Sequence, residues 1–144
     1  MLKKFLRRLL GSDTLFPPPP EHVPTGIGYV PLVRSSQIVG SWAIGPHRAR
    51  LMTDIRALGH VEYTHLLMVQ DANNAPLYVV ASEVNSMAGM LGGGSHFLAV
   101  FDEEGHHTFD SDDAWADLDA FRDHALGMIR ERFGAEPTPL PDEP

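Results

Sequence analysis

The chain has 144 residues, with a hydrophobic content of 43%, a charged content of 21% and a formal net charge of −8 at pH 7. This length favours one domain with a single core, and the composition is ordinary for a globular protein. Because the sequence contains no cysteine, it excludes a disulfide scaffold, a thiolate nucleophile and a zinc ribbon, and it is compatible with a reducing cytoplasm.

The first ten residues combine an apolar stripe with a basic face. Their interleaved charges exclude a secretory signal, and a bilayer-spanning helix needs about twenty residues. We expect residues 1–16 to form a basic amphipathic leader that contacts an anionic membrane surface. Docking of the leader on its own domain or on a second copy, and simple disorder of the leader, stay open as the alternatives. The expected membrane contacts are Leu2, Phe5, Leu6 and Leu9 on the apolar face and Lys3, Lys4, Arg7 and Arg8 on the basic face.

A proline-rich linker is predicted over residues 17–24, because four consecutive prolines favour an extended, semi-rigid chain. The domain itself is predicted over 25–134. Its first part, 23–33, is interrupted by prolines and glycines and is expected to be irregular or at a sheet edge. Residues 36–44 are predicted to form a strand, in which Gly40 marks a bulge or a close approach.

Residues 46–58 are ambiguous, and the sequence favours a helix. Pro46 suits a first helical position, Leu51 and Ile55 share one helical face, and Gly59 stands where a C-cap belongs. A strand over 47–53 is the alternative.

The centre of the chain contains three runs rich in β-branched and aromatic residues, at 61–69, 77–84 and 96–101, and a short return at 106–109. The connections at 71–76 and 102–105 carry Asn, Asp and Gly, which favour tight turns. These runs predict an antiparallel meander.

Between the second and third runs, residues 85–95 contain three consecutive glycines. No Gly-Lys-Ser/Thr follows and the glycines lead into a strand, so the sequence argues against a phosphate-binding loop. We expect a mobile loop that exposes Met87, Met90 and Leu91 to a partner, or that packs them locally.

The last element is predicted as a helix over 112–133. Asp110 or Ser111 is the expected N-cap, Gly134 the expected terminator, and the acids and arginines sit at the ends that the helix dipole favours. Its apolar stripe is expected to cover one face of the sheet, and it comprises Trp115, Leu118, Phe121, Ala125, Met128 or Ile129, and Phe133. Residues 135–144 are rich in proline and acids and are expected to be disordered.

The predicted fold is therefore α+β: an antiparallel meander of four to five strands packed against a long C-terminal helix, with a shorter helix before the meander.

The sequence contains no recognisable catalytic motif. No serine lies in Gly-x-Ser-x-Gly, the chain is expected to be non-enzymatic, and no cofactor is predicted. A metal site is the weaker alternative, with His96, His106 or His107, and Asp110 or Glu83 as ligands in a two-His, one-carboxylate arrangement. Histidines in surface turns explain the same residues.

Charge is distributed unevenly, because residues 101–144 contain thirteen acids and three arginines. This acidic C-terminal segment argues against nucleic-acid binding and favours a basic protein partner. The leading hypothesis is a cytoplasmic protein-binding module of immunity or antitoxin type. A metal-dependent enzyme and a peripheral membrane scaffold anchored by the leader are the alternatives. The expected partner contacts are Met87, Met90, Leu91, Asp102, Glu103, Glu104, Asp113, Asp117 and Asp119.

Overall fold

The computed structural model describes residues 22–25 and 27–141. The predicted leader at 1–16 and its membrane contacts lie outside the described residues, so they stay predictions. No helix of the described part is long and apolar enough to cross a membrane.

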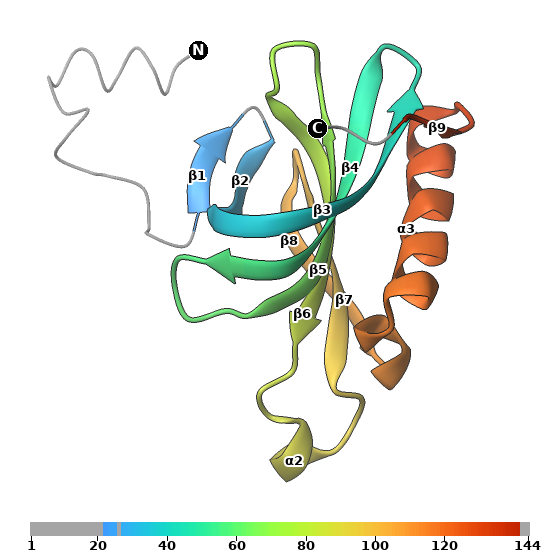
Figure 1. Cartoon of the computed structure of the whole chain (residues 1–144). Coiled ribbons are helices and arrows are strands. Elements are labelled where there is room, and N and C mark those ends of the chain that lie inside the picture. Colours follow the sequence, from blue (N-terminus) through green and yellow to red (C-terminus); the bar gives the residue numbers. More distant parts are fainter. Residues whose placement is uncertain (1–21, 26, 142–144) are drawn as a thin grey trace, which may run out of the picture.

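A seven-stranded antiparallel sheet dominates the structure (Figure 1). Its strand order is β8-β7-β6-β5-β4-β3-β9, so all but the last strand follow one another as a meander. The strands are β3 (Val33–Ile44), β4 (His47–Ala57), β5 (Tyr63–Gln70), β6 (Pro76–Val84), β7 (His96–Asp102), β8 (Gly105–Ser111) and β9 (Thr138–Pro139). A separate hairpin is formed by β1 (His22–Thr25) and β2 (Gly28–Pro31). The predicted meander is confirmed, but the sheet is larger than four to five strands.

The helix predicted over 46–58 is wrong, because these residues form β4. This strand pairs with β3 on one side and β5 on the other, so its backbone groups are satisfied across the sheet. Ala49 and Leu51 alternate into the core that faces the C-terminal helix, and this alternation decides the outcome over the helical spacing. Gly40 does mark a bulge, since the register with β4 shifts between Ile38 and Gly40.

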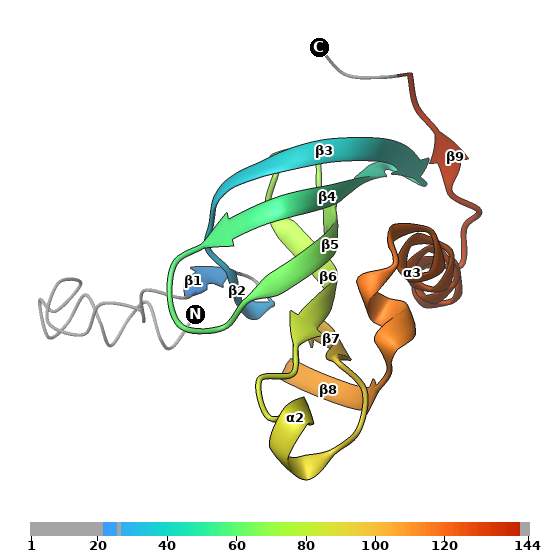
Figure 2. The same cartoon turned by 60° about the horizontal axis from the view of Figure 1, so that its bottom comes forward.

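Two apolar clusters lie on the two faces of the sheet. One face packs against α3 (Leu118–Phe133), whose Phe121, Ala125 and Ile129 are fully buried, as the predicted stripe requires. The other face packs against the β1–β2 hairpin through Ile27 and Val30. Figure 2 shows the sheet curving around α3.

The predicted C-terminal helix begins later than expected. Residues 112–117 instead hold the 3-10 helix η1 (Asp113–Ala116), which Asp112 caps, and Asp117 caps α3 by accepting a hydrogen bond from the amide of Ala120. The N-cap prediction of Asp110 or Ser111 is therefore wrong. Gly134 ends the helix in the left-handed conformation, with φ 64°, as predicted.

Part of the expected disordered tail joins the sheet. In β9, Thr138 lies opposite Ala43 and Pro139 opposite Trp42, and the amide of Leu140 donates to the carbonyl of Ser41. Composition predicts disorder here, but the free edge of β3 supplies partners that composition does not encode.

Residues 85–95 contain a single short helix, α2 (Ala88–Leu91), at one end of the sheet. The base of this loop is fixed by hydrogen bonds from the Asn85 side chain to the Gly94 carbonyl and from the Gly94 amide to the Ser111 hydroxyl. Met87 and Met90 are 44% and 79% exposed.

Candidate binding site

Acidic residues concentrate around one side of the molecule, which we call the acidic side: the β7–β8 turn, β8, η1 and α3. Residues 101–141 contain eleven acids and three arginines. Each of those arginines already pairs with an acid of this side or of the segment that follows it: Arg122 with Asp119 and Asp123, Arg130 with Glu136, and Arg132 with Glu103. Within the described part of the chain, the remaining carboxylates of this side have no arginine partner.

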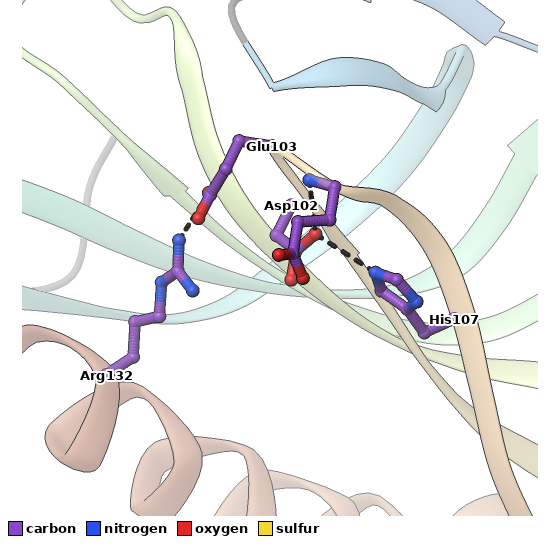
Figure 3. A network of polar contacts seen from close by, with 5 residues as sticks. Asp102, Glu103, His107 and Arg132 are labelled. Atoms are coloured by element: carbon purple, nitrogen blue, oxygen red, sulfur yellow. Dashed lines mark hydrogen bonds and ion pairs between the residues drawn. The ribbon is translucent and has the colours of Figure 1, made fainter.

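The β7–β8 turn is tied to the end of α3 (Figure 3). Asp102 accepts a hydrogen bond of 2.8 Å from the amide of Glu104, and its Oδ1 lies 3.1 Å from Nε2 of His107. Glu103 accepts a hydrogen bond from Arg132, which lowers the pKa of Glu103 and raises that of Arg132. The guanidinium of Arg132 also lies over the ring of Tyr78, 5.1 Å from its centroid.

Asp102, Glu104 and His107 form the group of metal-binding side chains that the described residues bring together, with ligand atoms within 4.8 Å of one another. The group differs from the predicted set. His96 lies at the other end of β7, and the ring of His106 faces Glu83 at 3.1 Å, so His96, His106 and Asp110 do not form one site. Because Asp102 and His107 contact each other directly across the β7–β8 turn, a structural role in this turn explains why the three side chains lie close together.

An apolar groove runs between β8 and α3. We call it the β8–α3 groove; its volume is about 320 Å³, and it is lined by Leu98, Phe109, Asp110, Trp115, His124 and Met128. The side chain of Phe109 is exposed (51%), although it is a large apolar group on a polar strand. The indole Nε1 of Trp115 is buried and has no hydrogen-bond partner among the described residues, and the indole ring packs on His124 with centroids 4.8 Å apart.

The outer edge of β8 adds backbone groups to this groove. β8 is the terminal strand of the sheet, and no described strand pairs with its outer side. Open edges of this kind accept extended segments through main-chain hydrogen bonds. The groove therefore combines an apolar lining, the open edge of the strand that borders it and the carboxylate of Asp110.

The predicted partner contacts separate into two groups in space. Met87 and Met90 belong to the loop before β7, whereas Asp102 is the last residue of this strand and Glu103 and Glu104 follow it. A strand of seven residues separates the ends by about 20 Å. Leu91 lies in α2, and its side chain is outside the described part.

The other predicted contacts lie near the starts of η1 and α3 and have structural partners. Asp113 accepts a hydrogen bond of 2.7 Å from the amide of Ser95, Asp117 caps α3, and Asp119 pairs with Arg122. These three residues contribute negative charge to this end of the acidic side, and their contacts also stabilise the local structure of η1 and α3.

Sequence reasoning missed the groove. It assigned Trp115 and Met128 to the core stripe, and both are indeed partly buried against the helix-side core. Phe109 carried the available signal, because it is an isolated aromatic residue in a polar return strand at the edge of the meander.

Ser95, just before β7, and His96, its first residue, form a second polar contact, although neighbouring residues of an extended chain point to opposite sides. The Ser95 hydroxyl nevertheless lies 2.7 Å from Nδ1 of His96, and Nε2 lies 2.9 Å from the hydroxyl of Thr64. Burial lowers the pKa of His96, the charge of His65 lowers it further, and Asp113 opposes the shift.

The backbone amides that lie nearest to this contact in the chain already have partners. The amides of Gly94 and Ser95, which lie nearest in the chain, already donate to Ser111 and Asp113. An oxyanion hole needs free donors aimed at the reacting carbonyl. We therefore interpret Ser95 and His96 as a structural link between β7, β5 and η1.

Comparisons of this chain with protein-family models, with curated proteins and with solved structures found no match.

Proposed function

We propose that this protein is a protein-binding module whose acidic side takes up a basic, partly apolar segment of a protein partner in the β8–α3 groove. The observation that supports this proposal is the exposed Phe109 beside the apolar groove, on a side of the molecule whose remaining carboxylates have no arginine partner among the described residues. Neutralisation of a basic toxin by an antitoxin-like protein is the specific version of this function that the small size and acidic charge favour.

Each feature of the groove contributes a different part of recognition. The negative charge of the acidic side steers a positively charged partner towards it and raises the association rate. Apolar and aromatic anchors supply most of the affinity once water is excluded.

Affinity capture from the native host tests the proposal. Phe109→Ser removes the exposed aromatic group of the groove, and Ile38→Ser is the matched control, because Ile38 is similarly exposed (47%) but lies on β3, towards the other edge of the sheet. We expect wild type and Ile38→Ser to capture the same basic protein in stoichiometric amounts, and Phe109→Ser to lose it. We also expect Asp110→Lys to slow association with the purified partner and to weaken its dependence on salt.

Equal capture by Phe109→Ser and Ile38→Ser would refute the groove as the binding site. Recovery of the protein in the membrane fraction without a protein partner would instead favour the leader as the functional element.

A further inference from the structure

A second cavity lies apart from the β8–α3 groove, beside the loop between β4 and β5 and the end of β6. Its volume is about 550 Å³, within the range of small-molecule sites. Its walls include Val61, Glu62, Glu83, Val84 and Phe97. Glu83 follows Val79 and Ala81 at alternate positions of β6, and both belong to the cluster on the face away from α3.

The carboxylate of Glu83 lies against the imidazole of His106. Its Oε1 is buried and lies 3.1 Å from Nε2 of His106, although the contact does not have hydrogen-bond geometry. The imidazole is itself fixed, because it stacks on Phe101 with centroids 4.5 Å apart and planes 7° apart. The Glu83 side chain is only 13% exposed, and it lines the cavity. Its position is therefore set by packing.

Among the described residues, the cavity carries negative charge without a permanent counter-charge. Glu62 and Glu83 line it, and neither lysine nor arginine is among the described lining residues. His106 is charged only when protonated. A largely buried carboxylate is costly to keep unless a cation pairs with it. Val61, Val84 and Phe97 provide apolar walls beside this charge.

We propose that this cavity binds an organic cation: an ammonium or guanidinium group on a short hydrocarbon stem, with Glu83 as its ion-pair partner and the apolar walls around the stem. The site does not depend on the β8–α3 groove, because it is lined by different residues. A free amine or guanidine and an arginine or lysine side chain of a protein share this chemistry.

Calorimetry and amide NMR on the full-length protein test the cation site with small probes. Butylguanidinium and butylammonium are expected to bind and to shift the amides of Glu83, Val84 and Phe97. Butylurea, a neutral analogue of butylguanidinium, is expected to bind at least about tenfold more weakly, as loss of a charged hydrogen-bonded pair predicts. This comparison uses wild-type protein, so it holds even if a variant fails to fold.

Two variants locate the charge. Glu83→Gln should weaken butylguanidinium binding at least about tenfold, whereas Glu62→Gln, which alters an exposed carboxylate, should weaken it less. N-acetyl-arginine methylamide separates the two sources: binding as tight as that of butylguanidinium supports a protein side chain, and weaker binding supports a free small cation. Equal binding of butylurea and butylguanidinium, unchanged affinity in folded Glu83→Gln, or amide shifts elsewhere in the protein would overturn the proposal.

Discussion

Replacement of Gly94 by alanine should destabilise the protein strongly, because the chain has no space for a side chain there. A Cβ built on Gly94 would lie 2.3 Å from both the Cα and the amide nitrogen of Asp112, and 2.7 Å from its carbonyl carbon. Non-bonded carbon atoms are in favourable contact at about 3.5–4 Å, so the two segments would have to separate by about 1 Å. Two neighbouring hydrogen bonds would be strained. The amide of Asp112 donates to the carbonyl of His96 at 2.8 Å, and the amide of Ser95 donates to the side chain of Asp113 at 2.7 Å.

The expected loss of unfolding free energy follows from these contacts. Overpacking costs about 1–3 kcal/mol, and the two weakened hydrogen bonds together add about 1 kcal/mol, which gives about 2–4 kcal/mol in total. For a chain of this length the Tm should fall by about 5–15 °C. Urea unfolding followed by circular dichroism gives the free energy, and a thermal scan gives the Tm.

Gly89→Ala is the matched control. It changes the same residue type in the same loop, yet a Cβ at Gly89 meets no atom within 4 Å, and the position lies in α2. Alanine favours helices over glycine by up to about 1 kcal/mol, so stability should be unchanged or slightly higher. If Gly94→Ala is no more destabilising than Gly89→Ala, the close approach of residues 94 and 112 is refuted.

Two further predictions concern ionisation. The pKa of His96 should lie below its ordinary value of 6.5, chiefly because of burial. As the pH falls, the unfolded chain therefore takes up a proton at a higher pH than the folded chain does. The stability contributed by neutral His96 is complete above about pH 6.5 and is lost as the pH falls below that value. An NMR titration of the His96 ring checks the direction, and a value at or above 6.5 would contradict it. Arg132→Ala should raise the pKa of Glu103, because it removes the hydrogen bond that lowers it. In wild type, protonation of Glu103 at low pH lowers the stability of the folded state, and this contribution should be absent in Arg132→Ala. Carboxyl ¹³C NMR measures the shift, and an unchanged Glu103 titration would show that the pair does not form.

Local patterns in the sequence determined the elements that depend on chain neighbours. The stripe that includes Phe121, Ala125 and Ile129 recurs at the helical period, so it predicts which face of α3 is buried before any partner is known. Gly134 likewise ends the helix for a local reason, since a left-handed residue is needed there. The runs that became β5, β6 and β7 followed from the same kind of local preference.

Tertiary structure alone decided the features that join distant positions. Leu51 and Ile55 have helical spacing, yet β4 forms because β3 and β5 satisfy its backbone on both sides. Thr138 enters the sheet for the same reason, because it pairs along the free edge of β3.

The candidate sites follow this rule too. Phe109 and Met128 line one groove only after β8 and α3 have packed on the sheet, and Glu83 meets His106 only through the register of β6, β7 and β8. The sequence determined where negative charge is concentrated and which residues prefer strand or helix. The registers that place those residues against one another depend on pairing and packing between segments far apart in the chain, which a local pattern does not encode.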